Sequence, residues 1–249
     1  MNKNILVTGS NGQLATQIKN IVLNKSNYNY IFKNKIELDI TNHELVNKFV
    51  NDNKIHIIIN CAAFTDVEKA EYFEELADKI NHLAVKNLAK IVKRNKIGLI
   101  HISTDYVFDG EKKTPYKECD KAKPLNNYGK TKLNGELALK KINPENSMII
   151  RTSWLYSKNG NNFFNKIIEL SKSKNLIDVV SDQFGSPTNA LSLAKAIIKV
   201  IDDLYSKNLR IYHFSDLGIC SRYDFAKSII KQNGIDIKIR PIKSYELNQ

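Results

Sequence analysis

The chain has 249 residues, of which 42% are hydrophobic and 26% are charged, the composition of an ordinary globular protein. This length is long for one core and short for two independent ones, so we expect one domain with an elaborated lobe. A net charge of +12 suggests a nucleic-acid-binding protein. The lysines, however, are spread along predicted helices without interleaved aromatic residues. We therefore expect no nucleic-acid partner. We also expect no membrane partner, because no apolar run approaches the ~18 residues of a membrane span.

Strands and helices alternate along the first 152 residues. The predicted strands are near-continuously apolar and cover residues 5–8, 28–32, 55–59, 98–104 and 147–152. The predicted helices cover residues 13–24, 41–50, 73–93 and 127–142, and the second opens on the capping box Thr41-Asn-His-Glu44. Apolar strands separated by helices indicate a parallel sheet that is covered on both faces. The predicted fold class is therefore a doubly wound α/β sheet of the NAD(P)-binding Rossmann type, with ligands at the carboxyl ends of the strands.

The pattern loosens after residue 152. Predicted helices cover residues 161–173, 191–204 and 223–233, and predicted strands cover residues 176–180 and 211–214. We expect these elements to complete the sheet and to be interleaved with a smaller substrate lobe. The chain is accordingly divided into a Rossmann domain, residues 1–152, and a C-terminal substrate lobe, residues 153–249.

A glycine-rich loop, Thr8-Gly9-x-x-Gly12-x-x-Ala15, follows the first predicted strand and opens a helix. Glycines at these places let the backbone approach a pyrophosphate, whose charge is favoured by the helix N-terminus. The loop predicts a dinucleotide site; a turn without a ligand is the alternative. The acidic ribose ligand expected about 20 residues further on is missing. Lys33 stands there instead, either to bind the 2′-phosphate of NADPH or as an ordinary surface lysine. Asp39 either faces the adenine or caps the following helix.

Tyr128 and Lys132 lie four residues apart on a predicted helix and therefore share one face, with their Cβ atoms roughly 6 Å apart. An ammonium beside a phenol favours the phenolate, so we expect a lowered pKa for Tyr128. Such a phenol can protonate a carbonyl oxygen as a hydride reaches the carbon. Thr104 ends the central strand and either hydrogen-bonds that carbonyl or caps a turn. Trp154, the only tryptophan, either stacks on a sugar or base ring or packs in the core.

The cysteines and histidines indicate which cellular compartment and which metal sites to expect. The three cysteines are scattered and include no Cys-x-x-Cys pair, so they predict free thiols in a reducing compartment. The five histidines show no ligand spacing, so we expect no metal site. The sequence runs from Met1 directly into a strand with no signal peptide. We therefore expect a cytoplasmic protein.

Eight segments, in this order, carry a family resemblance: Gly9-x-x-Gly-Gln-Leu14, Leu38-Asp-Ile-Thr41, Asn60-Cys-Ala-Ala-Phe-Thr-Asp-Val-Glu-Lys-Ala-Glu71, Ser103-Thr-Asp-Tyr-Val-Phe-Asp-Gly110, Pro124-Leu-Asn-Asn-Tyr-Gly-Lys-Thr-Lys132, Arg151-Thr-Ser-Trp154, Gly160-Asn-Asn-Phe163 and Asp182-Gln-Phe-Gly-Ser-Pro-Thr188. With them the chain resembles the extended short-chain dehydrogenases/reductases. Within that class it resembles the dTDP-4-dehydrorhamnose reductase family, across nearly its whole length.

The resemblance implies NAD(P)H-dependent reduction of the C4 ketone of a nucleotide-linked 4-keto-6-deoxy sugar, with dTDP-4-dehydro-L-rhamnose as the leading substrate and dTDP-L-rhamnose as the product. It implies that Tyr128 protonates the C4 oxygen, Lys132 holds the nicotinamide ribose and Thr104 orients the carbonyl. Cofactor contacts map to Gly9, Gly12, Gln13, Leu14, Asp39, Ile40, Ala62, Ala63 and Thr65, together with Tyr128 and Lys132. Substrate contacts map to Thr104, Asp105 and Trp154. A homodimer is also expected.

Two departures from the family pattern keep alternatives open. Lys33 stands near the place of an acidic ribose ligand in some members, which leaves NADH open beside NADPH. Members usually continue through an Arg-Pro-x-x-Ser motif into a helix that helps to close the sugar site. Arg240-Pro-Ile-Lys-Ser244 is either that motif or the Pro-Ile segment before it. The alternatives are a reductase or epimerase of another nucleotide sugar, or a non-catalytic NADP-binding regulatory subunit. The short tail favours the subunit, and the intact Thr104, Tyr128 and Lys132 oppose it.

Overall fold

The computed structural model describes residues 3–23, 27–204 and 206–246. These residues divide into two compact units, one within Met1–Thr152 and Ala194–His213 and the other within Ser153–Leu193 and Phe214–Gln249. The chain passes from the second unit into the first within helix α8 (Ala190–Val200) and returns at the end of strand β10 (Arg210–Phe214).

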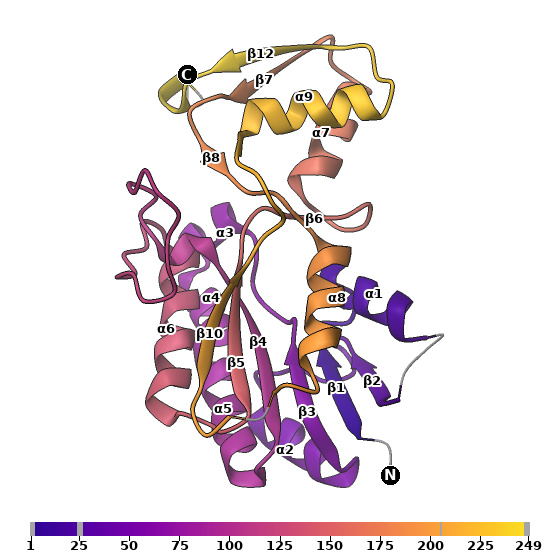
Figure 1. Ribbon diagram of the computed structural model, residues 1–249, viewed down its shortest axis with the longest axis vertical. Helices are drawn as coiled ribbons and strands as arrows, with labels where there is room; N and C mark the ends of the chain where they lie inside the picture. The colour runs from indigo at the N-terminus through magenta and orange to yellow at the C-terminus, as the bar shows by residue number, and fades with distance from the viewer. Residues whose placement is uncertain (1–2, 24–26, 205, 247–249) are drawn as a thin grey trace. The chain divides into compact units, whose positions relative to one another are not determined.

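The first unit is built on a six-stranded sheet with the order β10-β5-β4-β3-β1-β2, and helices lie on both sides of it (Figure 1). Its other strands are β1 (Asn4–Thr8), β2 (Asn29–Lys33), β3 (Ile55–Asn60), β4 (Gly98–Thr104) and β5 (Ser147–Thr152). These five pair in parallel. The order reverses beside β1, so ligands are expected outside the carboxyl ends of β1 and β3. The predicted doubly wound α/β fold is confirmed.

The helical segments of this unit before β5 are α1 (Gln13–Val22), α2 (His43–Asp52), α3 (Val67–Tyr72), α4 (Glu74–Asp78), the π-helical turn η1 (Lys79–Leu83), α5 (Ala84–Asn95), the 3-10 turn η2 (Asp105–Val107) and α6 (Asn127–Ile142). One core cluster joins α2, α5 and α6 to one face of the sheet. Its buried members include Leu6, Ile58, Leu99, Val46, Leu88 and Leu139. Burial of these side chains holds α6 on the strands, since each buried side chain contributes about 1.5–3 kcal/mol to the stability of the fold.

In its described residues the second unit contains three two-stranded sheets, helices α7 and α9, and the first turn of α8. Its strands are β6 (Leu155–Tyr156), β7 (Leu176–Val180), β8 (Phe184–Gly185), β9 (Thr188–Asn189), β11 (Cys220–Ser221) and β12 (Lys238–Ile242), which pair as β6-β9, β7-β12 and β8-β11. Helices α7 (Phe163–Ser171) and α9 (Arg222–Gln232) pack on β7 through Ile167, Ile177 and Ile229. The 3-10 turn η3 (Ser244–Glu246) follows β12.

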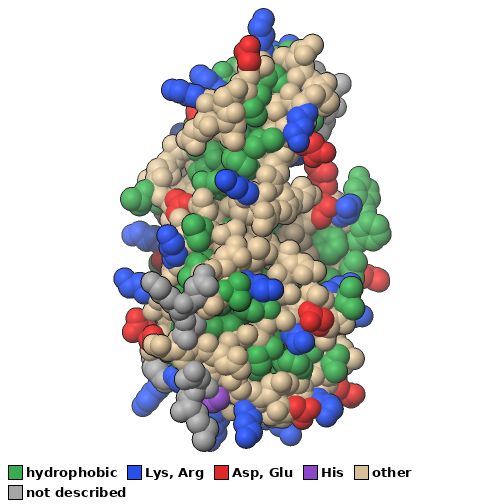
Figure 2. Space-filling model, turned by 90° about the vertical axis from the view of Figure 1, so that its right-hand side faces the viewer, with side chains coloured by type: hydrophobic (Ala, Val, Ile, Leu, Met, Phe, Trp, Pro, Cys, Tyr) green, Lys and Arg blue, Asp and Glu red, His purple; other side chains and the backbone are tan. Residues whose placement is uncertain are grey.

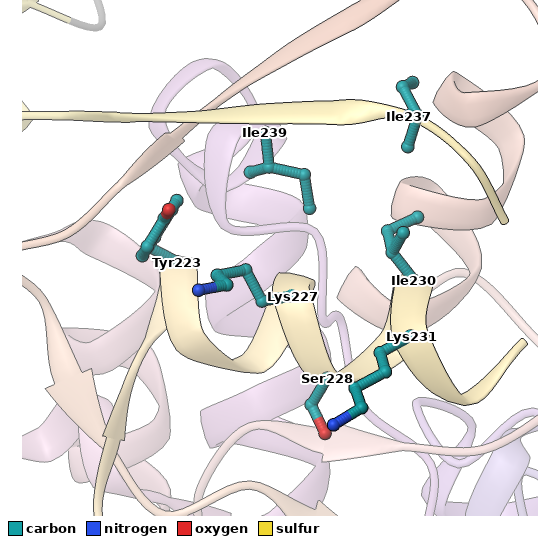
Figure 3. Close-up of a pocket in the computed structure, with 7 residues that line it drawn as sticks. All are labelled: Tyr223, Lys227, Ser228, Ile230, Lys231, Ile237 and Ile239. Atoms are coloured by element: carbon teal, nitrogen blue, oxygen red, sulfur yellow. The ribbon is translucent and has the colours of Figure 1, made fainter. Parts of the chain in front are cut away.

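A hollow of about 440 Å³ opens beside α9 in this second unit (Figure 3). It is lined by Tyr223, Lys227, Ser228, Ile230, Lys231, Ile237 and Ile239. None of the residues predicted to bind cofactor or substrate belongs to this lining.

Several predicted elements differ from the structure. The single helix predicted for residues 73–93 is three segments, because the backbone winds into the π-helical turn η1 between α4 and α5. Helix α2 is capped by Asn42 rather than Thr41, since the Asn42 side chain accepts from the amide of Leu45. Strand β7 pairs with β12 and does not extend the main sheet, whereas β10 does. The predicted helix end at residue 24 lies outside the described residues.

Candidate active site

The glycine-rich loop lies against the segment that follows β3. Gly9 has a φ of +67°, and a Cβ added there would lie 2.7 Å from the amide nitrogen of Ala62, so only glycine fits. Gly12 is the N-cap of α1 and makes no side-chain capping hydrogen bond. Helix α1 then begins at Gln13, and Leu14, its second residue, is buried. The loop therefore presents an uncapped helix N-terminus at the sheet's switch point, which suits the negative charge of a diphosphate.

The residues predicted to contact the ribose and adenine lie at the end of β2 and before α2. Lys33 ends β2, and its backbone carbonyl accepts from the amide of Ser10 in the glycine-rich loop. Its ammonium lies 3.4 Å from the carboxylate of Glu37, which offsets part of its charge. The carboxylate of Asp39 accepts from the amide of Thr41, so it stabilises the turn before α2, and Ile40 is buried.

The loop between β3 and α3 carries the remaining predicted cofactor residues. Ala62 and Ala63 are half-buried and Thr65 is exposed. The loop is held by Asn81 of η1, whose side chain accepts from the amide of Phe64 (2.9 Å) and donates to its carbonyl (3.0 Å). Asn81 is a site residue that the sequence analysis missed. It was taken as part of one long regular helix, and only the π-helical turn reveals its role.

Thr104, Tyr128 and Lys132 come together where β4 ends against α6. Thr104 is buried, and its hydroxyl accepts from the amide of Tyr106 (3.2 Å) and donates to the carboxylate of Asp105 (3.1 Å). Tyr128, in the first turn of α6, packs edge-on against Tyr106 with ring centroids 5.5 Å apart. The Lys132 ammonium is buried and donates to the backbone carbonyl of Ile102 at 2.7 Å.

Burial shifts the pKa values of Tyr128 and Lys132 in the directions that favour the neutral form of each side chain. It raises the pKa of Tyr128 well above its ordinary value, and a hydrogen bond with the Thr104 side chain only partly opposes this. The expectation of a lowered Tyr128 pKa is therefore wrong, because desolvation of the phenol dominates. Burial likewise lowers the pKa of Lys132 to about 8, against the opposing charge of Glu136 and an opposing contribution from Cys61. The same environment raises the pKa of the Cys61 thiol to about 12.

Trp154 lies in the second unit, in an unusual conformation with a φ of +44°. The guanidinium of Arg222, the first residue of α9, lies 3.6 Å from the centroid of the indole ring. Gly185 packs so closely against the indole that a Cβ there would lie 2.6 Å from it. The ring is thus held between protein groups on at least two sides, which limits how a sugar or base could stack on it.

The surface of the protein carries mixed charges. Figure 2 shows lysines and arginines dispersed over the visible face among acidic and apolar side chains. Within the described ranges no helix combines the length and apolar character that a bilayer crossing requires. In the same residues, no group of three or more His, Cys, Asp or Glu side chains is placed to hold a metal ion.

A doubly wound sheet that brings a glycine-rich loop, a tyrosine, a lysine and a threonine to its strand ends defines the class of short-chain dehydrogenases/reductases. Comparison with known proteins narrows the class. Residues 3–249 match the family model described as the RmlD substrate binding domain. The chain belongs to this family, that of the dTDP-4-dehydrorhamnose reductases.

Three relatives illustrate the similarity. The dTDP-4-dehydrorhamnose reductase of Aggregatibacter actinomycetemcomitans is 37% identical over 92% of this chain and 78% of its own. The dTDP-4-keto-6-deoxy-D-glucose reductase of Streptomyces niveus is 35% identical over 96% of this chain and 82% of its own. A crystal structure of the dTDP-4-dehydrorhamnose reductase of Bacillus anthracis in complex with NADP has a TM-score of 0.92 and 39% identity. That match covers 99% of this chain and 86% of the other.

Proposed function

We propose that this protein is an NADPH-dependent reductase that converts the C4 ketone of a nucleotide-linked 4-keto-6-deoxy sugar to an alcohol. The leading substrate is dTDP-4-dehydro-L-rhamnose, and the product is dTDP-L-rhamnose. The observation that carries the proposal is the meeting of Thr104, Tyr128 and Lys132 at the end of β4 in a chain of this reductase family. We assign cofactor binding to residues 1–152 and sugar recognition mainly to residues 153–249.

The residues present fit the cofactor. Gly9 lets the loop pack closely against the backbone of Ala62, and the N-terminus of α1, which has no side-chain cap, would offer backbone amides to a diphosphate. Ala62, Ala63 and Thr65 would line the cofactor, together with Gln13, Leu14, Asp39 and Ile40. Lys33 would face the 2′-phosphate, as its place at the end of β2 allows. When bound, NADPH supplies the hydride that reduces C4.

The catalytic residues handle the proton. Tyr128 donates its phenolic proton to the C4 oxygen as negative charge develops there, and with its raised pKa the phenol is protonated at neutral pH. Thr104 orients the ketone oxygen by a hydrogen bond, and Asp105 and Trp154 contact the sugar nucleotide. Lys132, when charged, holds the nicotinamide ribose and stabilises the phenolate that forms on Tyr128.

The test is oxidation of NADPH and NADH, followed at 340 nm with dTDP-4-dehydrorhamnose as substrate. We expect turnover with NADPH that Tyr128→Phe reduces by at least about 100-fold, the low end of general acid catalysis. Tyr72→Phe is the matched control, because Tyr72 is 84% exposed on α3. Turnover of Tyr128→Phe within a few-fold of the wild type would remove Tyr128 as the acid. Lys33→Ala, assayed with both cofactors, tests the 2′-phosphate assignment.

A second candidate is a reductase of another sugar or of the opposite C4 configuration, which the Streptomyces niveus relative favours by its name. The catalytic residues would be the same, so NMR of the product's C4 configuration separates the two. Binding of NADPH with no consumption of either keto sugar would point instead to a non-catalytic subunit.

Two further parts of the proposal concern the cellular compartment and the oligomeric state. An enzyme that draws on NADPH and a nucleotide sugar works where both are made, so we assign it to the cytoplasm. The assembly that we propose is a homodimer, and light scattering coupled to size-exclusion chromatography measures its mass directly.

A further inference from the structure

Glu136 is a fully buried carboxylate one helical turn beyond Lys132 on α6. It accepts a hydrogen bond from the hydroxyl of Ser103 on β4 at 2.6 Å. It also accepts from Arg151 on β5, from Nε at 2.9 Å and from Nη2 at 2.6 Å. The bidentate pair joins α6 to β5, and the hydrogen bond from Ser103 joins it to β4.

The arginine side of the pair continues across the sheet. Arg151 is only 3% exposed, and its guanidinium lies 5.0 Å from the ring centroid of Phe108. Its Nη1 lies 3.3 Å from Nε2 of His213 on β10, whose backbone amide donates to the carboxylate of Glu118. The buried groups Glu136 and Arg151 are therefore linked to three neighbouring strands of the sheet, β4, β5 and β10.

Lys132 is a buried ammonium that needs a nearby negative charge. Its one hydrogen-bond acceptor in the described structure is the carbonyl of Ile102, the neighbour of Ser103. Two groups act to raise its pKa, Glu136 on its own helix and Cys61 after β3, and the Cys61 thiol stays protonated at neutral pH because burial raises its pKa. His101 on β4 faces the same charge and is held neutral by burial, so it supplies no compensation. Glu136 is left as the anionic group that acts on Lys132, although its carboxylate also pairs with Arg151.

We propose that Glu136 is a positioning residue that keeps the buried Lys132 ammonium charged and fixes α6 in place on β4 and β5 through Ser103 and Arg151. The effect on turnover rests on the proposed function, but the effect on the charge of Lys132 does not. A buried pair that served folding alone could be exchanged for apolar groups without changing Lys132. The charge of Lys132 therefore separates the two roles.

The experiment measures the titration of Lys132 by NMR of protein labelled with ¹³C,¹⁵N-lysine, with the Lys132 signal identified by its absence in Lys132→Gln. In Glu136→Gln we expect the Lys132 pKa to fall by about one unit or more, as for loss of an opposite charge nearby. Glu136→Asp keeps the charge and should retain most of the wild-type pKa. Lys130→Gln is the matched control, because it removes an exposed ion pair with Glu74 from the solvent face of the same helix.

The pH profile of kcat/KM gives a second readout. We expect the basic limb of the profile to move to lower pH in Glu136→Gln by the same amount as the Lys132 pKa. If the wild type shows no turnover but the Lys132 pKa is lower in Glu136→Gln than in the wild type, the charge role of Glu136 is supported and the proposed function is contradicted. A Lys132 pKa unchanged in Glu136→Gln would overturn the inference while leaving the reductase assignment intact.

A variant that exchanges both members of the pair covers the case in which Glu136→Gln does not fold. Glu136→Gln combined with Arg151→Met removes both members of the ion pair, so no unpaired guanidinium is left, and it tests whether the carboxylate acts on Lys132 more strongly than the guanidinium that pairs with it. We expect the lowered Lys132 pKa to persist in this double variant. A double variant that keeps the wild-type pKa, or that does not fold, would assign the pair to folding alone and overturn the proposal.

Discussion

Replacing Gly135 by alanine tests how far the candidate active site depends on the close approach of α6 to the π-helical turn η1. A Cβ built on Gly135 lies 2.2 Å from the backbone carbonyl oxygen of Asn81 and 3.6 Å from Cβ of Val85. Real Cβ atoms essentially never approach another heavy atom within 3.0 Å. Helix α6 must therefore move away from η1 by roughly 1 Å, or η1 must unwind locally.

One favourable and two unfavourable contributions set the change in the free energy of unfolding. Alanine is favoured over glycine by about 1 kcal/mol inside a helix. Overpacking of this kind costs about 1–3 kcal/mol. The shift also strains the buried hydrogen bonds of the Asn81 side chain to Phe64 and to Thr131, the latter at 3.2 Å, and each such bond contributes about 1 kcal/mol. We expect the free energy of unfolding to fall by about 1–2 kcal/mol, and kcat to fall because α6 carries Tyr128 and Lys132.

Urea denaturation followed by circular dichroism at 222 nm measures the stability, and NADPH oxidation measures kcat. Lys140→Ala is the matched control, since it introduces alanine at an exposed position of the same helix and should leave both quantities nearly unchanged. The opposite outcome is a Gly135→Ala protein that is more stable than the wild type by about 1 kcal/mol, with unchanged kcat. That result would mean that α6 and η1 are further apart than the structure places them.

Three further predictions concern the cofactor loop, the lysine and the tryptophan. Gly9→Ala forces a side chain into φ +67° and against Ala62, so we expect a loss of at least about 1 kcal/mol in stability by urea denaturation. Gly12→Ala, at φ −75°, should lose less, and equal losses would contradict the geometry. In the wild type, kcat/KM should fall as pH rises through about 8, because Lys132 then loses its charge; a profile flat to pH 10 would contradict this. Gly185→Ala should shift the emission of Trp154, the sole tryptophan, because its Cβ would overlap the indole; an unchanged spectrum would argue against that packing.

The main sheet was predictable from sequence because its strands are short apolar runs between helices. The predicted limits of β4, β5, β7 and α6 agree with the structure. The burial of both sheet faces replaces polar–apolar alternation by continuous apolar runs, and the shortness of these runs distinguishes them from buried helices. The glycine spacing likewise located a tight turn between β1 and α1, since a positive φ and a close backbone approach leave no other residue at Gly9.

Other features depend on tertiary contacts that no local pattern encodes. The turn η1 has the sequence of an ordinary helix, and its π-helical winding accompanies the bonding of Asn81 to a loop 17 residues away. The pairing of β7 with β12 was missed because Arg240-Pro241 suggested a motif rather than a strand. Proline is tolerated there, at the edge of a two-stranded ribbon. Glu136 was invisible as a site residue, since its partner Arg151 follows 15 residues later on another element.

The direction of the Tyr128 pKa shift was also predicted wrongly, because it too depends on tertiary burial. A Tyr–Lys pair on one helix face lowers the phenol pKa only where the ammonium is charged and close and the phenol is solvated. Here both groups are buried, and burial favours the neutral phenol and the neutral amine together. A neutral phenol can act as the proton donor at neutral pH. A neutral lysine, however, could not stabilise the phenolate left after proton transfer. The site therefore needs a source of negative charge near Lys132 that leaves Tyr128 protonated, and Glu136, one helical turn beyond Lys132 and two turns beyond Tyr128, occupies the position that meets both conditions.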